Sequence, residues 1–284
     1  MTLFFAALFL CAALYPFYVV HKHTLGHHEP VVRTPEEWGV DYEEISYETD
    51  DGVLLKGWWI PSKGSRAVLL LHGKRGSRNG YHSGIFDLAH WYRKNGWSVM
   101  LADMRAHGES GGKRVTFGLK EHEDMLGWLK HMDASMAYSW RVHGFSMGAV
   151  TALMMDEKEP GRFESVIADA PWIDFEKLAK QELWKRASLP PLFYGYIKWI
   201  AKNFFGQDFD FVDNRQRCKK LCGRNILYIF EAKDTLLGSL HKNILRRLCP
   251  VAKTVWFEET GHVEAFKAHP ARYTQALEGV SESE

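Results

Sequence analysis

A serine between two glycines is the residue of this sequence best suited to covalent chemistry. Residues 144–148 read Gly-Phe-Ser-Met-Gly, the G-x-S-x-G pattern that sets a serine on a sharp turn between a strand and a helix. The glycines remove the Cβ atoms that would clash in so tight a turn, and the N–H groups of the helix that follows point toward developing negative charge. The sequence therefore predicts Ser146 as a nucleophile.

A serine hydroxyl is a weak nucleophile, so it needs a base, and the base needs a carboxylate that orients it. Of the 14 histidines, His262 is best placed because it follows the last expected strand of the chain. Asp234 follows the strand before that one and is the expected carboxylate, with Asp169 at the end of an earlier strand as the alternative. The predicted catalytic set is Ser146, Asp234 and His262.

The tetrahedral intermediate of acyl transfer carries an oxyanion, which needs two hydrogen-bond donors. One expected donor is the backbone N–H of Met147, next to the serine. The other is the backbone N–H of Lys74, in the loop after the expected strand that ends at Leu71. The side chains of Lys74 and Arg75 could bind an anionic group of a substrate, although a solvated loop is the simpler interpretation.

Strands and helices that alternate along the chain must bring these residues together. Unbroken apolar runs are typical of strands buried on both faces, and the Asp51-Gly52 pair is typical of a hairpin turn. We expect an α/β fold whose mostly parallel central sheet is flanked by helices and has antiparallel strands at one edge. The expected strands are 44–48, 53–60, 67–71, 98–102, 140–143, 165–168, 225–230 and 254–257, and the expected helices are 81–94, 119–131 and 147–155.

The segment 171–214 interrupts this alternation and is too long for one crossover helix. It contains 11 of the 39 aromatic residues of the chain, and apolar residues recur at helical spacing over residues 192–204. We interpret the segment as a helical cap over a pocket, with ordinary core packing as the second interpretation. A cap in which Trp184 and Phe193 meet the acyl group would favour apolar substrates.

The N-terminus contains a stretch without charged residues at positions 3–20. This length is at the lower limit for crossing a bilayer, so we expect a membrane anchor at residues 1–22, with a signal peptide or a buried helix as alternatives. A linker at 23–40, whose histidines we expect to be solvated, then leads to one domain at 41–280. Lys22 and Arg33 follow the apolar stretch and nothing basic precedes it, which favours a cytoplasmic domain.

Composition excludes several classes of protein. With 46% hydrophobic and 25% charged residues, the chain is not predominantly disordered. It has 36 Lys and Arg against 35 Asp and Glu, so a basic surface for nucleic acid is not expected. The cysteines lack the spacing of a metal site or of a disulfide framework, and we interpret all four as small hydrophobic residues: Cys11, Cys218, Cys222 and Cys249. No metal or organic cofactor is expected.

Five motifs carry a resemblance to a known superfamily: LLLHG at 69–73, DMRAHGESGG at 103–112, GFSMGA at 144–149, AKDTLL at 232–237 and GHVEAF at 261–266. Over residues 40–280 the chain resembles the α/β-hydrolase superfamily, above all its serine-aminopeptidase/monoacylglycerol-lipase-like branch, which includes membrane-anchored members. The resemblance implies a serine hydrolase with Ser146, Asp234 and His262 as its triad. One departure is Phe230-Glu231, where the family usually has His-Gly ahead of the triad acid.

We therefore expect an enzyme that hydrolyses carboxylic esters, lipid-derived or of medium chain length, through an acyl-serine intermediate. Its expected partners are a small-molecule ester and, through the N-terminal segment, a membrane. A peptidase, an amidase or a thioesterase would use the same triad, because the fold does not choose among these activities. The alternative outside enzymes is an inactive, membrane-tethered binding protein on the same scaffold.

Overall fold

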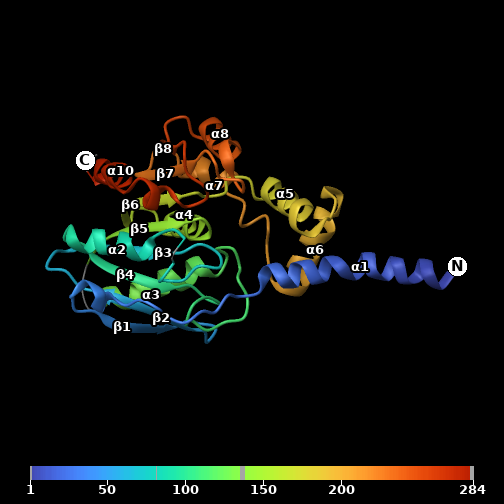
Figure 1. Cartoon of the computed structure of the whole chain (residues 1–284), viewed down its shortest axis with the longest axis horizontal. Helices are drawn as coiled ribbons and strands as arrows, with labels where there is room; N and C mark the ends of the chain where they lie inside the picture. The colour runs from blue at the N-terminus through green and yellow to red at the C-terminus, as the bar shows by residue number, and fades with distance from the viewer. Residues whose placement is uncertain (1, 81, 135–137, 282–284) are drawn as a thin grey trace.

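The central sheet of the protein has eight strands in the order β1-β2-β4-β3-β5-β6-β7-β8 (Figure 1). The computed structural model describes residues 2–80, 82–134 and 138–281, with side chains from residue 13 to residue 280. The strands are Glu43–Glu48 (β1), Leu54–Ile60 (β2), Arg66–Leu71 (β3), Ser98–Asp103 (β4), Ser139–Phe145 (β5), Phe163–Asp169 (β6), Ile226–Glu231 (β7) and Lys253–Phe257 (β8). Strand β2 pairs antiparallel with β1 and with β4, and all the other pairs are parallel.

The predicted mostly parallel sheet with a hairpin at one edge is confirmed. Each expected strand begins and ends within two residues of an observed one. The apolar runs succeed as predictors because these strands are covered on both faces, as in β3, where every residue from Ala67 to Leu71 is buried. The helix expected at 81–94 is observed at Ile85–Lys94 (α2), and Tyr81 lies outside the described residues.

Helices cover both faces of the sheet. Two hydrophobic clusters divide the residues of β3, with Val68 and Leu70 in one and Leu69 and Leu71 in the other, because successive side chains of a strand point to opposite faces. The first cluster includes α2 and α10 (Pro270–Ser281), and the second includes α3 (Glu121–Asp133), α4 (Met147–Lys158) and α8 (Gly238–Leu248). Two short helices, Pro35–Trp38 (η1) and Ala265–Ala268 (α9), lie in the connections.

The segment between β6 and β7 is helical, and its residues 171–214 are called the cap below. It contains α5 (Phe175–Ala187), η2 (Pro191–Phe193) and α6 (Tyr194–Phe205), and α7 (Arg215–Lys220) follows it. Asp174 caps the N-terminus of α5, because its side chain accepts a hydrogen bond from the Lys177 N–H, and Gly206 caps the C-terminus of α6 in the left-handed conformation. Figure 1 shows α5 and α6 standing off one end of the sheet.

The N-terminal helix α1 (Thr2–Thr24) lies beside α6 and projects beyond the cap (Figure 1). The Phe17 ring lies 4.9 Å from that of Phe204 and 6.4 Å from that of Tyr196, between ring centroids. The Tyr196 hydroxyl donates a hydrogen bond to the Ala13 carbonyl at 3.3 Å. Within the described part of the chain, no helix combines the length and the apolar character needed to cross a membrane.

The start of the expected linker is hydrogen-bonded to the domain. The Gly26 N–H donates to the Lys113 carbonyl at 3.1 Å, and the His27 N–H donates to the Ala106 carbonyl at 2.7 Å. The backbone of these residues is therefore fixed, although the sequence predicted a solvated segment. The histidine-rich composition of this segment did not reveal these backbone hydrogen bonds, because they depend on the loop between β4 and α3, which is distant in sequence.

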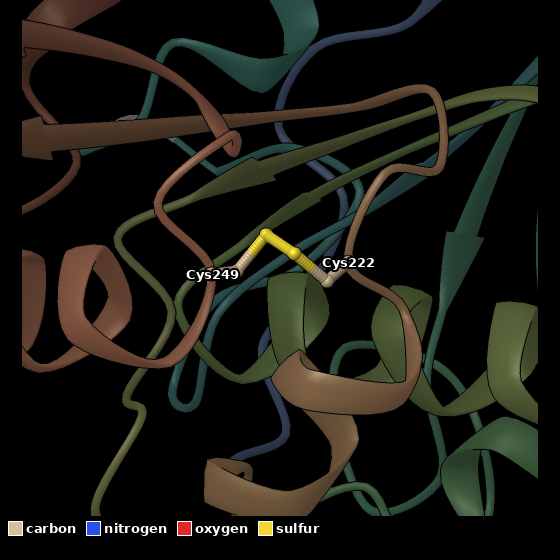
Figure 2. The surroundings of a disulfide bond; sticks show 2 residues. All are labelled: Cys222 and Cys249. Atoms are coloured by element: carbon tan, nitrogen blue, oxygen red, sulfur yellow. A yellow bond between two sulfur atoms is a disulfide. The ribbon is translucent and has the colours of Figure 1, made fainter.

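Cys222 and Cys249 form a disulfide (Figure 2), which corrects the interpretation of all four cysteines as small hydrophobic residues. Cys222 precedes β7 and Cys249 follows α8, so the packing of α8 on β7 brings their Cα atoms to 5.4 Å across a sequence separation of 27. Closing a loop of this length restricts the unfolded chain and stabilises the fold by about 3 to 4 kcal/mol in the chain-entropy description. Cys218 is a buried free thiol, and the Cys11 side chain lies outside the described ones.

Candidate active site

Ser146 occupies a strained turn between β5 and α4. Its backbone has φ 52° and ψ −110°, a conformation that residues with a Cβ rarely adopt. A Cβ on Gly144 would lie 2.1 Å from the Gly148 carbonyl oxygen, and one on Gly148 would lie 2.3 Å from the Leu71 carbonyl oxygen. Both glycines of the motif are therefore required by close backbone contacts, and the turn that they permit presents the serine hydroxyl at the end of the sheet.

The three predicted catalytic side chains form one hydrogen-bonded chain. His262 Nε2 lies 2.8 Å from Ser146 Oγ, and His262 Nδ1 lies 2.7 Å from Asp234 Oδ2. The serine comes from the end of β5, the aspartate from the loop after β7 and the histidine from the loop after β8, so three parallel strands deliver them to one edge. A ring that donates its Nδ1–H to the carboxylate has its Nε2 lone pair free to accept the serine proton.

The Asp234 carboxylate is fixed by further donors. Its Oδ1 accepts hydrogen bonds from the Leu236 N–H at 2.7 Å and the Leu237 N–H at 3.0 Å. Burial opposes ionisation of Asp234, but the hydrogen bond and charge of His262 and these two amides outweigh it, and they hold the pKa of Asp234 below its usual value. The group that orients the imidazole is therefore ionised at neutral pH.

Asp169, the alternative acid, bonds to a different side chain. Its Oδ2 accepts a hydrogen bond from the Tyr273 hydroxyl at 2.6 Å. Its register partner on β7 is Ile229, and the buried Glu231 lies two residues further along that strand, on the same face. Burial raises the pKa of Asp169 to about 6, although hydrogen bonds from Glu231 and Tyr273 lower it. Burial and then the adjacent Asp169 raise the pKa of Glu231 well above its ordinary value. Burial and the proximity of the two carboxyl groups therefore oppose the ionisation of both together, and they favour the protonated form of Glu231.

The sequence analysis did not assign Glu231 to the site, although one signal pointed to it. Glu231 belongs to the Phe230-Glu231 pair that departs from the usual family motif. A glutamate in an otherwise apolar strand, next to the strand that ends at Asp169, is the pattern that identifies such a pair once the strand order is known. Strand order is not readable from residue types alone.

Replacing Glu231 by Gln is expected to change how stability depends on pH. The folded chain holds a proton on Glu231 that the unfolded chain releases above the ordinary glutamate pKa of about 4.3, so the free energy of unfolding of the wild type falls as pH rises above that value. A glutamine also donates to Asp169 but does not titrate. Urea denaturation between pH 5 and pH 8 should therefore show Glu231→Gln gaining stability relative to the wild type as pH rises.

The matched control for that experiment is Glu258→Gln, which replaces an exposed glutamate beyond β8. Its stability difference from the wild type should stay small across the same range, because surface substitutions typically change stability by less than about 0.5 kcal/mol. A Glu231→Gln difference that does not vary with pH would show that the buried pair holds no extra proton.

The two expected oxyanion donors border Ser146. Met147 is the first residue of α4, and a Cβ on Gly73 would lie 3.3 Å from the Ser146 Cβ, so the loop that contains Lys74 passes directly by the serine. Their role as donors stays a prediction. The Lys74 side chain is half-buried and bonded within the fold: its Nζ donates to the His23 carbonyl at 2.6 Å and lies 5.0 Å from the centre of the Phe117 ring. Burial, followed by the charges of Arg75 and Arg186, lowers the pKa of Lys74 to about 8.

A mainly apolar cavity of about 180 Å³ opens at Ser146. The cap supplies half of its lining residues, among them Trp172, Phe175, Leu178, Leu183, Ile197 and Phe209. Helix α1 supplies the rest of that side through Val19, Val20, His23 and Thr24. Trp184 and Phe193 are not among the lining residues, and Trp184 is exposed, so the expectation that they meet the acyl group is wrong.

The polar groups of the cavity wall do not form a metal site. In the ranges that the structure describes, no three side chains of the His, Cys, Asp and Glu types converge as a metal ion would require. Burial and then the nearby Lys74 lower the pKa of His23 to about 4, so this histidine is neutral at pH 7. The arrangement therefore offers a nucleophile, a base and an apolar pocket beside them.

Comparisons with known proteins agree with this geometry. A sequence profile described as "alpha/beta hydrolase fold" matches residues 66–212, more than half of the chain. YNL320W, an uncharacterized membrane protein of Saccharomyces cerevisiae, is 25% identical over 234 residues, which cover 80% of this chain and 75% of that protein. Protein bem46 of Schizosaccharomyces pombe is 24% identical over 226 residues, which cover 78% and 70% of the two chains.

Solved structures share the fold. The Pyrococcus furiosus esterase Pf2001 matches with a TM-score of 0.73 at 24% identity, over 90% of this chain and 97% of the esterase. The sheet order, the serine on its strained turn and the match to the family profile lead to the same assignment: this chain belongs to the alpha/beta hydrolase fold family.

Proposed function

We propose that this protein is a serine hydrolase that cleaves carboxylic esters through an acyl-serine intermediate. The observation that carries the proposal is the hydrogen-bonded chain from Ser146 through His262 to Asp234 at the mouth of an apolar cavity. The similarity in fold to an esterase supports it. Within the family, we place the chain in the serine-aminopeptidase/monoacylglycerol-lipase-like branch on its sequence motifs.

The reaction begins when Ser146 Oγ attacks the ester carbonyl while His262 Nε2 takes the hydroxyl proton. Backbone N–H groups of Met147 and Lys74 stabilise the oxyanion, and Asp234 holds the imidazolium in place. His262 then gives its proton to the leaving alcohol, which departs and leaves the acyl group on the serine. A water molecule, deprotonated by His262, releases the acid by the reverse sequence. A peptidase, an amidase or a thioesterase would follow the same steps.

The length of the acyl chain is expected to control catalytic efficiency. Each methylene that the cavity buries adds up to about 0.8 kcal/mol of binding, or roughly fourfold in affinity, and efficiency gains only the part that is kept in the transition state. The kcat/KM for p-nitrophenyl esters should therefore rise from acetate to at least hexanoate. Leu178→Trp, which fills the cavity, should move the maximum to shorter chains and leave acetate hydrolysis nearly unchanged.

Trp184→Ala is the control on the same helix, because Trp184 is exposed and does not line the cavity. It should keep the wild-type chain-length profile. A wild-type profile that falls steeply after acetate would replace the lipid-ester proposal with a short-chain esterase. Cleavage of aminoacyl amides faster than of any ester would replace it with a peptidase.

We also propose that residues 1–22 hold the domain at a membrane. The uncharged stretch at residues 3–20 and the similarity to a yeast membrane protein support this.

The disulfide bears on the side of the membrane on which the domain lies. Disulfides persist in non-reducing compartments, so the Cys222–Cys249 bond supports a domain on the oxidising side, in place of the cytoplasmic side that Lys22 and Arg33 favour. The test is to quench cells with acid, which stops thiol exchange, and then to alkylate the free thiols without adding a reductant. Alkylation of both Cys222 and Cys249 under these conditions would contradict the disulfide and the oxidising side.

A further inference from the structure

Large apolar side chains are exposed where α1 meets the cap. Leu14 and Tyr18 of α1 are 54% and 56% exposed, and Trp199 and Phe204 of α6 are 51% and 58% exposed. A lone exposed apolar residue is ordinary on a soluble protein, but a contiguous group marks an interaction site. These four residues are called the α1–α6 face below.

Ring contacts connect the two helices at this face. Phe17 joins the two helices, because its ring lies 4.9 Å from that of Phe204 between centroids. Phe204 in turn lies 5.4 Å from Trp199. Leu14 and Tyr18 are four residues apart and so project from the same side of α1. Figure 1 shows α1 and α6 side by side, with the N-terminal part of α1 extending beyond the cap.

The inner side of the same two helices lines the cavity at Ser146. Val19 and Val20 of α1 and Ile197 of α6 are buried and line the cavity, whereas Tyr18 and Trp199 lie on the outside. The cavity is thus separated from the α1–α6 face by a single layer of helices. A substrate that lay against this face would be about one helix diameter, roughly 10 Å, from the cavity.

A lipid bilayer is the partner that best fits this face. Tyrosine and tryptophan are enriched at the level of lipid headgroups, where an apolar ring with a polar edge is stabilised. Leu14 and Tyr18 belong to the uncharged stretch at residues 3–20, so the apolar region available to a bilayer includes a helix and is larger than the four exposed side chains. The Lys22 ammonium lies 5.9 Å from the centre of the Tyr18 ring, beside the face, where a lipid phosphate would find a cation.

We propose that the α1–α6 face rests in the interfacial layer of a membrane, so that the enzyme takes its acyl ester from the bilayer rather than from water. This inference rests on the proposed ester hydrolysis and names the source of its substrate. The outer side of α1 and α6 contacts lipid, and their inner side holds the acyl chain beside Ser146. A docked face of this kind places the cap, and not the opposite side of the sheet, next to the membrane.

The position of the face is tested with a fluorescent label. The full-length chain carries Cys11→Ala and either Phe204→Cys or, as the matched control, Val251→Cys, an exposed apolar position after α8. Each is labelled with an environment-sensitive dye and mixed with phosphatidylcholine vesicles that contain anionic lipid. We expect a blue shift of emission at position 204 and none at position 251. Equal spectra at both positions would overturn docking on the membrane. A blue shift at position 204 that appears without lipid and grows with protein concentration would also overturn it, because the face would then bind a second copy of the protein.

The source of the substrate is tested by activity on two substrates. The double variant Trp199→Ser and Phe204→Ser should lose at least about tenfold in the rate on p-nitrophenyl palmitate embedded in vesicles. The same protein should keep the rate on dissolved p-nitrophenyl butyrate, because neither residue lines the cavity. Val251→Ser should change neither rate.

The outcomes separate the two proposals. If the wild type hydrolyses neither ester, the proposed function is wrong, while the label at position 204 still reports whether the face meets the bilayer. If the double variant hydrolyses the vesicle-bound ester as fast as the wild type, the face does not deliver the substrate. If both rates fall together, the substitutions have disturbed the active site and delivery from the membrane is again rejected.

Discussion

Ser146→Ala is expected to lower kcat for ester hydrolysis by about four to six orders of magnitude, because a nucleophile, its base and the orienting acid act as a unit. The substitution removes one oxygen at a partly buried position and leaves the hydrogen bond between His262 and Asp234 in place. The variant should still fold, since alanine and serine both carry a Cβ and therefore have the same backbone strain at a φ of 52°. The measurement is the rate on p-nitrophenyl butyrate, with labelling by a fluorophosphonate as a second readout.

Ser188→Ala is a matched control for that substitution. Ser188 also has a φ of 52°, but it ends α5 on the exposed surface, away from the triad. It should retain the wild-type rate and the wild-type labelling. A purified, folded Ser146→Ala protein that still hydrolyses the ester would contradict the serine mechanism. A wild type that neither reacts with the fluorophosphonate nor cleaves esters would instead favour the inactive binding protein.

Asp234→Asn is expected to lower kcat by about four orders of magnitude, because an amide that donates to His262 Nδ1 fixes the wrong tautomer of the imidazole. Asp169→Asn should cost far less activity, since Asp169 accepts its hydrogen bond from Tyr273, whereas His262 Nδ1 lies against Asp234. Steady-state kinetics of the two variants, compared after circular dichroism shows that both are folded, decide the assignment. The opposite ranking would make Asp169 the acid of the triad.

The strands and the proximity of Ser146, Asp234 and His262 could be predicted because both depend on local sequence. The run from Ala67 to Leu71 is apolar at every position, and only a strand covered on both faces needs that pattern. The three predicted catalytic residues each follow such a run, and parallel strands end at the same edge of a sheet. Ser146, Asp234 and His262 therefore had to lie near one another once the runs were identified as parallel strands.

The features that sequence analysis missed depend on which elements become neighbours. The Cys222–Cys249 bond forms because α8 packs on β7, and a separation of 27 residues carries no sign of that. In the sequence, Glu231 is a single polar residue in an apolar strand. Its proximity to Asp169 follows only from the pairing of β7 with β6. In the cap, helical spacing predicted α6, but this spacing does not show whether Phe204 packs against another part of the protein or lies exposed on the surface.

Helix α1 has a consequence for how this protein is produced. Apolar N-terminal segments are commonly deleted to obtain protein that purifies without detergent. Here a deletion that ended at Thr24 would remove Val19, Val20 and His23 from the cavity wall and would leave the inner side of α6 open to water. Acyl preferences recorded on such a shortened chain would describe a different cavity. A deletion that stops at residue 12 keeps every lining residue, so the chosen starting residue decides whether the measured specificity belongs to this enzyme.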